Sequence, residues 1–120
     1  MSPESKRDWR LYAEDIIGAC EKVRRYIAGM TFDAFLADER TRDAVIRNIE
    51  IVGEAAKGIP DDVAAGAPEI PWRNVRGMRD VLAHGYFSAS SEIIWATATT
   101  RLDAIEAAAR RLLGAQTPDR

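Results

Sequence analysis

Apolar side chains recur every three or four residues along most of this chain, and this spacing restricts the fold more than any other feature. The first stripe consists of Trp9, Tyr12, Ile16, Cys20, Val23, Ile27 and Met30. Such spacing places the side chains on one face of an α-helix, so one long amphipathic helix is predicted here. Strand-like alternation of apolar and polar residues is absent from the sequence. An all-α fold is therefore expected.

The same spacing, together with helix start and stop signals, predicts the remaining elements. They begin with a short Thr-capped helix or turn over 31–37 and a helix from about Asp38 to Lys57. A loop with at most one helical turn follows over 60–71, and then a helix from Pro71 to Gly85. The last helix ends at Gly114, and its apolar stripe consists of Ile94, Ala98, Leu102, Ile105, Ala109 and Leu112. Phe32 and Phe35 are available to close one end of a core. Short connections between such helices predict an antiparallel four-to-five-helix bundle.

Length and composition are consistent with one folded domain. The chain has 120 residues, of which 47% are hydrophobic and 30% charged. A second core would lack apolar material, so we expect a single domain over 1–120 with a core over about 8–113. The charged start does not resemble a secretory signal, and no window approaches the roughly 20 apolar residues that span a bilayer. A cytoplasmic protein without membrane contact is expected.

Histidine, cysteine and net charge limit the chemistry. The chain holds one cysteine, Cys20, and one histidine, His84. A zinc site built from several such ligands is thereby excluded within one chain, and neither a metal nor a cofactor is expected. Cys20 is predicted to be a small buried apolar group. The net charge of −2 argues against a broad basic surface, so any contact with RNA must be local.

One segment, residues 72–87, gathers three arginines, the histidine and a tyrosine. An imidazole titrates near neutral pH and can take a proton from a 2′-hydroxyl, which makes His84 a candidate catalyst. The Arg79 guanidinium could stabilise the extra charge on a pentacovalent phosphorus. Arg73 and Arg76 could position the RNA backbone through its phosphates.

The order of these residues resembles a known family. Arg79, Asp80, His84 and Tyr86 are similar to the Arg-x4-His-x-Tyr motif of HEPN domains, and the string from Met78 to Phe87 resembles HepT-type toxins. The strings at 49–57, 71–73 and 93–95 also resemble this subfamily, so the likeness covers most of residues 8–113. Asparagine is more usual than Asp80 after the arginine. The Asp80 carboxylate could pair with Arg79 or Arg76 and damp activity.

The resemblance implies a HEPN-like helical dimer that acts as a metal-independent endoribonuclease, the toxin of a bacterial toxin–antitoxin pair. It implies Arg79 and His84 as catalytic residues, Asp80 as support, and a minimal nucleotidyltransferase antitoxin that neutralises the toxin by adding AMP to the motif tyrosine, here Tyr86. Other HEPN proteins bind a nucleotide or a nucleotidyltransferase partner without cleaving RNA. That non-catalytic role is the alternative, and a merely structural helical dimer is a third hypothesis.

Helix geometry suggests that two chains cooperate. Arg79 and His84 diverge by about 140° around a straight helix, so either the helix ends near His84 or the site combines two chains. Arg73, Asp80 and His84 lie within about 20° of one line, which should border a cleft or a dimer face. If cleavage needs one imidazole as base and another as acid, the second must come from a partner chain. A homodimer is therefore expected.

Each of these residues also has a purely structural interpretation. His84 beside Gly85 could cap a helix, and Tyr86 could be a half-buried aromatic. Arg73, Arg76 and Arg79 could form a salt-bridged face with Asp80. For Glu50 and Glu54, flanked by Arg47 and Lys57, we expect a solvated salt-bridged face without a catalytic role. Trp72 and Trp95 are expected to anchor the core or a dimer interface.

Overall fold

The computed structural model describes residues 7–79 and 91–116, and within these ranges every regular element is helical. In chain order they are α1 (Trp9–Ile27), α2 (Phe32–Ala37), α3 (Glu39–Ala56), α4 (Asp61–Ala64), α5 (Trp72–Arg76), α7 (Ser91–Ala96), the π-helical segment η2 (Thr97–Arg101) and α8 (Leu102–Gln116). The predicted all-α fold is confirmed.

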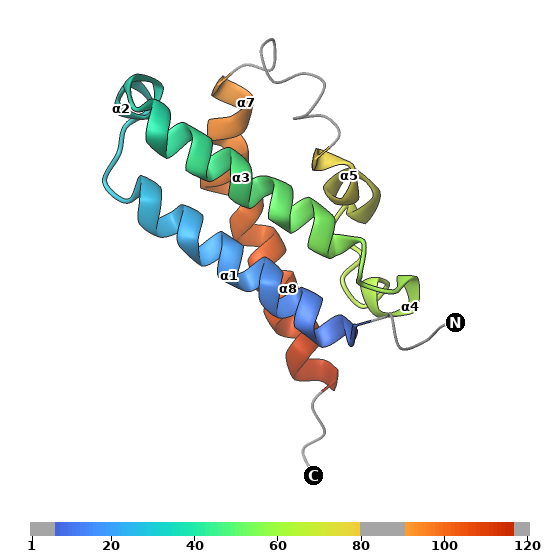
Figure 1. The fold of residues 1–120 in the computed structure, drawn as a ribbon. Coiled ribbons are helices and arrows are strands. Elements are labelled where there is room, and N and C mark those ends of the chain that lie inside the picture. The colour runs from blue at the N-terminus through green and yellow to red at the C-terminus, as the bar shows by residue number, and fades with distance from the viewer. Residues whose placement is uncertain (1–6, 80–90, 117–120) are drawn as a thin grey trace.

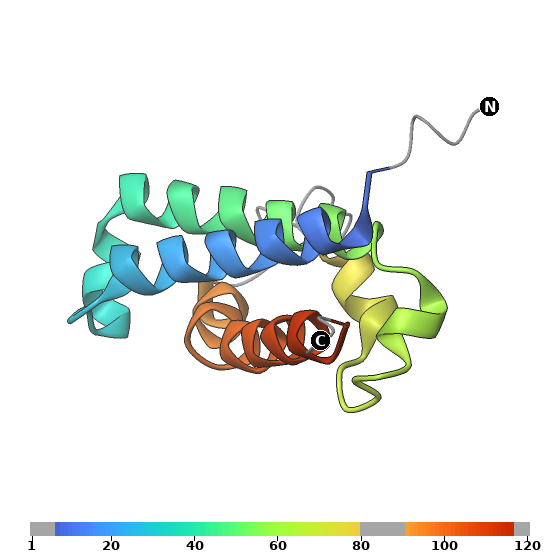
Figure 2. The same ribbon diagram turned by 90° about the horizontal axis from the view of Figure 1, so that it is seen from below.

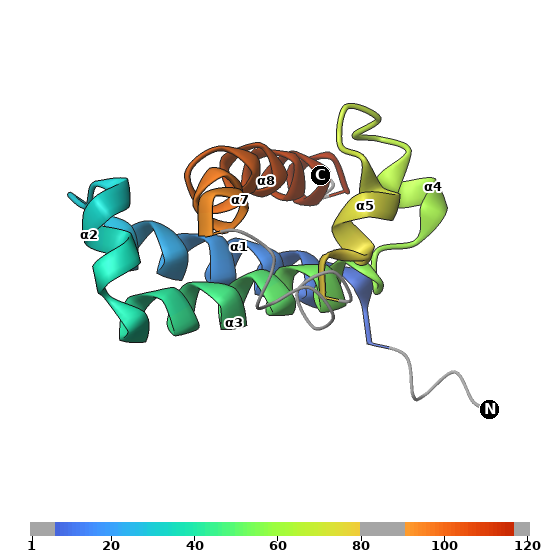
Figure 3. The same ribbon diagram turned by 90° about the horizontal axis from the view of Figure 1, so that it is seen from above.

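The helices form two layers. The long helices α1 and α3 run antiparallel, side by side, and α8 crosses the pair on one face (Figures 1 and 2). The short helices α4 and α5 lie at the end of this bundle where α3 finishes, whereas α2 and α7 lie at the opposite end (Figure 3). This arrangement is an antiparallel helical bundle, as the sequence predicts.

Side-chain caps fix where the first three helices begin. The carboxylate of Asp8 accepts a hydrogen bond from the Arg10 backbone N–H, and Asp38 accepts one from the Thr41 N–H. The Thr31 hydroxyl accepts a bond from the Ala34 N–H, which confirms the predicted cap. Each cap satisfies a backbone donor that the helix itself leaves unpaired.

The predicted apolar stripes form the core. The most deeply buried large side chains are Phe35, Ile16, Ile49, Leu102, Val23, Val45 and Val52. At one end, the Trp95 ring packs on Phe35 with ring centroids 5.0 Å apart and on Phe32 at 6.1 Å. Trp72 is buried and donates its indole N–H to the Ala67 carbonyl at 3.1 Å. Both tryptophans are therefore core anchors.

Cys20 is buried within the core, as predicted. Burial is the main cause that raises the pKa of its thiol to about 12. The side chain is therefore a neutral apolar group at physiological pH.

The predicted helix over 71–85 is interrupted. Helix α5 ends at Arg76, a turn follows at Gly77, and residues 78 and 79 are helical again. Glycine is a poor helix former, which explains why the break falls there. The expected alignment of Arg73 with Asp80 and His84 assumed an unbroken helix, and it stays a prediction. Positions 80–85 of that helix lie outside the described residues.

The predicted last helix also differs in detail. Its stripe is buried as expected, but the backbone adopts a π-helical turn over Thr97–Arg101. The Thr97 hydroxyl donates to the Ile93 carbonyl at 2.9 Å, and the Thr99 hydroxyl to the Trp95 carbonyl at 2.7 Å. Threonine hydroxyls that bond to the preceding turn in this way often bend helices. Helix α8 continues past the predicted end at Gly114 to Gln116.

None of the described helices is long and apolar enough to cross a membrane.

Candidate functional site

The structure describes three of the six predicted site residues. Arg73 and Arg76 lie on α5, and Arg79 lies two residues after the Gly77 turn. Asp80, His84 and Tyr86 lie outside the described residues. The environment of Arg79 is therefore the described part of the candidate site.

Arg79 is exposed and lines a cleft of about 610 Å³ between the beginning of α1 and the second half of α3. We call this the α1–α3 cleft. The other residues that line it are Arg7, Tyr12, Asp15, Arg47, Glu50, Ile51, Glu54, Ala55, Lys57 and Gly58. The motif arginine thus opens onto a surface that is formed largely by residues 7–58, far from it in the sequence.

Gly53 holds the Arg79 segment close to α3. A Cβ atom at this position would lie 3.1 Å from the Val75 carbonyl oxygen and 3.3 Å from the Arg79 backbone nitrogen. Those distances are shorter than ordinary van der Waals contact, so any other residue would push the two segments apart. The glycine in the last turn of α3 is explained by this close approach, which sets the distance between the Arg79 backbone and α3.

Arg76 has a different environment. Its Nε donates to the Ala56 carbonyl at 3.1 Å and its Nη2 to the Ile59 carbonyl at 2.8 Å, while its Nη1 lies 3.3 Å from Asp61. Arg76 therefore caps the end of α3, and phosphate binding by this residue stays a prediction.

Arg73 is exposed on α5 and does not line the α1–α3 cleft. Of the three predicted phosphate-binding or catalytic arginines that the structure describes, Arg79 alone opens onto this cleft. A role of Arg73 in positioning RNA stays a prediction.

Ion pairs neutralise only some of the charges in the cleft. Arg7 pairs with Asp15 at 2.8 Å, and Lys57 pairs with Glu54 at 3.5 Å. Within the described ranges, Arg47, Glu50 and Arg79 form no ion pair. The expected salt-bridged face on α3 is thus confirmed for Lys57 and Glu54, whereas Arg47 and Glu50 do not pair with each other.

Arg79 is the only cleft residue that was predicted from the sequence to belong to the site, so Arg47 was missed. Its signal was present, because Arg47, Glu50, Ile51 and Glu54 occur at spacings of three and four and so share one face of α3. The spacing does not show, however, that this face of α3 lies next to Arg79.

The Tyr12 ring also lines the cleft. A Cβ atom on Gly58 would lie 2.2 Å from the Tyr12 ring, so the ring lies directly on the glycine backbone. The Arg7 guanidinium lies over the same ring, 4.6 Å from its centroid. A second hollow, lined in part by Trp9 and Arg10, shares Arg7, Tyr12, Lys57 and Gly58 with the cleft and extends it.

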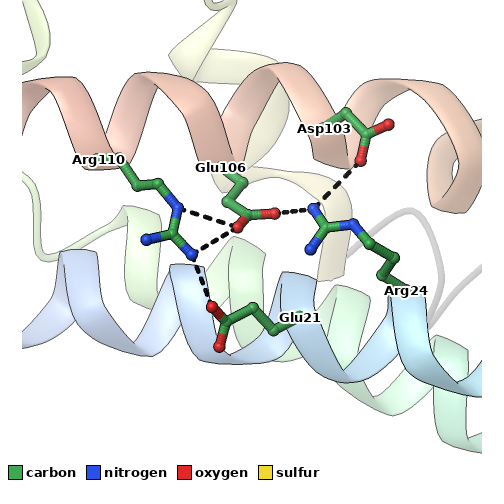
Figure 4. A network of polar contacts seen from close by, with 5 residues as sticks. All are labelled: Glu21, Arg24, Asp103, Glu106 and Arg110. Carbon is green, nitrogen blue, oxygen red and sulfur yellow. Dashed lines mark hydrogen bonds and ion pairs between the residues drawn. The ribbon is translucent and has the colours of Figure 1, made fainter.

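A second charged cluster lies between α1 and α8 and has a different character (Figure 4). Glu106 is buried and accepts hydrogen bonds from Arg24 and, at 2.8 and 3.1 Å, from Arg110. Arg110 also binds Glu21 at 2.6 Å, and Arg24 binds Asp103 at 3.4 Å. We call these five residues the Glu106 cluster. It joins two core helices and leaves neither arginine unpaired.

The Glu106 carboxylate is ionised through its partners. Burial by itself would raise the pKa of Glu106, but the hydrogen bonds from Arg24 and Arg110 outweigh this effect and lower the pKa below its ordinary value. In the part of the chain that the structure describes, no group of three or more His, Cys, Asp or Glu side chains is placed to hold a metal ion.

Comparison with known proteins gives a consistent result. Residues 16–112 match the family model described as "Ribonuclease HepT-like". The chain is 45% identical over 92 residues to a Thermococcus cleftensis protein named "Probable ribonuclease HepT". The matched residues make up 77% of this chain and 84% of that relative. No solved structure gives a significant match.

Two further relatives have similar names. A Methanocaldococcus jannaschii protein named a "Putative RNase" is 41% identical over 75% of this chain and 74% of its own length. A "Putative RNase" of Caldanaerobacter subterraneus is 34% identical over 87% of this chain and 93% of its own length. The similarity therefore extends over most of the chain in each case.

Proposed function

The chain belongs to the HepT-like ribonuclease family, and we propose that it is a metal-independent endoribonuclease acting as the toxin of a toxin–antitoxin pair. The observation that supports this most strongly is the placement of Arg79. The motif arginine is exposed beside a cleft and has no ion pair with a described residue, and an exposed guanidinium of this kind is suited to bind a phosphate.

The proposed reaction uses the 2′-hydroxyl of the RNA as nucleophile. The 2′-oxygen forms a bond to phosphorus while the bond from phosphorus to the 5′-oxygen breaks. His84 takes the proton of the 2′-hydroxyl, and an acid supplies a proton to the leaving 5′-oxygen. Arg79 stabilises the charge that develops on the phosphoryl oxygens, with Asp80 in support. All of these groups come from the protein, which is why we propose that no metal is required.

Dimerisation follows from the number of histidines. Each chain holds a single imidazole, so a base and an acid that are both histidines require two chains. We propose that His84 of each protomer serves a shared site in a homodimer. A monomeric variant should then bind RNA but fail to cleave it.

Regulation is proposed to act through Tyr86. A minimal nucleotidyltransferase antitoxin would transfer AMP to its hydroxyl, two residues after His84. We propose that the added phosphate, an anion, competes with RNA for Arg79 by charge and by volume. We place both partners in the cytoplasm.

The first experiment measures RNA cleavage in EDTA by the wild-type protein and by His84→Ala at matched dimer content. We expect cleavage by the wild type and a loss of about 100-fold or more in the variant, the scale for removing a general acid–base group. Equal cleavage by the two proteins would contradict the role of His84. Absence of wild-type cleavage on a panel of RNAs would instead favour a nucleotide- or partner-binding subunit.

A second experiment separates the toxin role from the chemistry. Expression of the chain alone should arrest growth, and co-expression with a nucleotidyltransferase from the same genome should relieve the arrest. Tyr86→Phe should remain toxic in the presence of that partner, because it lacks the acceptor hydroxyl. Relief of Tyr86→Phe to the same extent as the wild type would contradict modification at this residue.

A further inference from the structure

We propose that the α1–α3 cleft binds the RNA strand beside the cleavage site and that Arg47 binds one of its phosphates. This inference rests on the proposed ribonuclease function and adds a substrate-binding surface to it. Arg47 lies 32 residues before Arg79 in the sequence, yet both side chains line the same cleft.

The first argument is the distribution of unpaired charge. The cleft holds four cations, and two of these, Arg7 and Lys57, are paired with Asp15 and Glu54. The two cations left without an ion pair among the described residues are Arg47 and Arg79. A charged guanidinium with free N–H donors is suited to bind a phosphate through two parallel hydrogen bonds.

The second argument is that both arginines are fixed to one rigid element. Arg47 is exposed on α3, a helix of 18 residues. The backbone of Arg79 packs on Gly53 of the same helix, with the distance set by the missing side chain. The spacing of the two backbone positions that carry these side chains is therefore determined by α3, and a phosphate chain could contact both side chains without reorganising the fold.

The third argument concerns the kind of nucleic acid. The Tyr12 ring lies against the Gly58 backbone, and the Arg7 guanidinium lies over the same ring, so the cleft contains a cation stacked on an aromatic group. The adjoining hollow continues to Trp9, over which the Arg10 guanidinium lies 5.7 Å from the ring centroid. Flat cationic and aromatic groups beside phosphate-binding arginines are typical of proteins that bind single strands. A single-stranded RNA is therefore the occupant that fits best.

The carboxylates in the cleft set an upper limit on affinity. Glu50 has no ion pair among the described residues and shares its face of α3 with Arg47. It repels phosphate, so binding should be moderate, strongly salt-dependent and restricted to the part of the cleft nearest the arginines.

The test compares Arg47→Ala with Arg40→Ala, an exposed arginine of the same helix that does not line the cleft. Binding of a short single-stranded oligonucleotide with 2′-deoxyriboses, which lack the nucleophile, is measured by fluorescence anisotropy at several salt concentrations. For Arg47→Ala we expect Kd to rise roughly three- to tenfold and the slope of log K against log salt to fall by about 0.7, the value for one phosphate contact on a single strand. Arg40→Ala should match the wild type.

A cleavage assay on RNA provides the second readout. Arg47→Ala should raise KM and leave kcat within about twofold, because Arg47 binds the strand and does not contact the reacting atoms. Arg47→Lys should restore the salt slope, since the charge is retained, but not all of the affinity, since the bidentate geometry is lost.

The outcomes are distinguishable. If the wild type cleaves RNA and Arg47→Ala binds the oligonucleotide as tightly as Arg40→Ala, this inference is wrong and the ribonuclease function stands. If Arg47→Ala changes the fraction of dimer in sedimentation and leaves RNA affinity unchanged, the cleft is a subunit interface and the inference is also wrong. If the wild type neither binds nor cleaves RNA, both proposals fail.

Discussion

Helix α1 takes part in two charged clusters that contain the same kinds of side chain and differ in almost every physical respect. Near its beginning, Arg7 and Asp15 line the α1–α3 cleft. Near its end, Glu21 and Arg24 join the Glu106 cluster with α8 (Figure 4). Comparing the two clusters indicates which charges hold the bundle together and which remain available to a ligand.

In the Glu106 cluster, every arginine is bonded and the central carboxylate is buried. Glu106 is 5% exposed and is contacted by two guanidinium groups from opposite sides. A buried carboxylate is costly unless it is fully bonded, so the cluster contributes to stability only as a complete unit. It has no free cation to offer an anion.

In the α1–α3 cleft, two of the four cations lack an ion pair among the described residues, and the side chains are largely exposed. Exposed charges contribute little to folding. Arg47 and Arg79 are thus available for binding at almost no cost in stability. The comparison indicates that pairing, and not the number of charged residues, separates a structural cluster from a candidate binding site.

The largest expected effect comes from the cleft. Arg79→Ala should lower the rate of RNA cleavage by about 100-fold or more, because it removes a charge from the transition state. Its free energy of unfolding in urea should stay within about 0.5 kcal/mol of the wild type, as for other exposed positions. Arg40→Ala, at an exposed arginine outside the cleft, is the control. A loss of cleavage as large as that of Arg79→Ala would show that the effect does not depend on the cleft.

The converse effect should come from the Glu106 cluster. Glu106→Gln should lower the free energy of unfolding by about 1–2 kcal/mol, because charge-assisted bonds from two arginines become neutral ones. The cleavage rate at a temperature where the protein is folded should not change. The matched control is Asp103→Asn, at an exposed carboxylate that also contacts Arg24, and its cost should stay below about 0.5 kcal/mol. Equal costs for the two variants would indicate that burial is not what matters.

Acidification should reduce the difference between the wild type and Glu106→Gln. The pKa of Glu106 is lower in the folded chain than its ordinary value, so its ionised form stabilises the fold at neutral pH. That contribution is present above the unfolded pKa of about 4.3 and is lost as the pH falls through the lower, folded pKa. Urea unfolding between pH 6 and pH 3 should therefore show the two proteins converging in stability. A difference that grows on acidification would contradict the lowered pKa.

The smallest expected effect is on oligonucleotide binding, and it tests whether RNA binds in the α1–α3 cleft. Glu50→Gln should tighten oligonucleotide binding by about two- to threefold, because it removes an unpaired negative charge beside Arg47. Glu14→Gln removes the same charge from an exposed position of α1 outside the cleft and should have no effect. A fall in kcat for Glu50→Gln would mean that the glutamate takes part in proton transfer, contrary to the structural role assigned to it.

Much of the fold could be predicted from the sequence because its signals are local. The apolar stripes place Ile16, Ile49 and Leu102 in the core, and the caps at Thr31 and Asp38 mark helix starts within one residue. These signals depend only on helical periodicity and on hydrogen bonds within one turn. The errors fall where local rules compete, as at the Gly77 turn and the π-helical segment.

The candidate site could be predicted only in part, since its geometry depends on contacts between distant elements. Which face of α3 meets Arg79 depends on Gly53 packing on the α5 segment, and Arg76 is occupied by carbonyl groups 17 and 20 residues away. Neither contact can be predicted from the spacing of residues within a single helix. The sequence identified Arg79 as a candidate but could not pair it with Arg47.

The most direct test asks which of the two charged clusters RNA contacts. The Nε–Hε resonances of the arginine side chains can be followed by NMR while a single-stranded 2′-deoxy oligonucleotide is added. We expect the resonances of Arg47 and Arg79 to shift in a salt-sensitive way, and those of Arg24 and Arg110 to stay in place. Shifts confined to Arg24 and Arg110, with Arg47 and Arg79 unaffected, would contradict the assignment of the α1–α3 cleft as the RNA-binding surface.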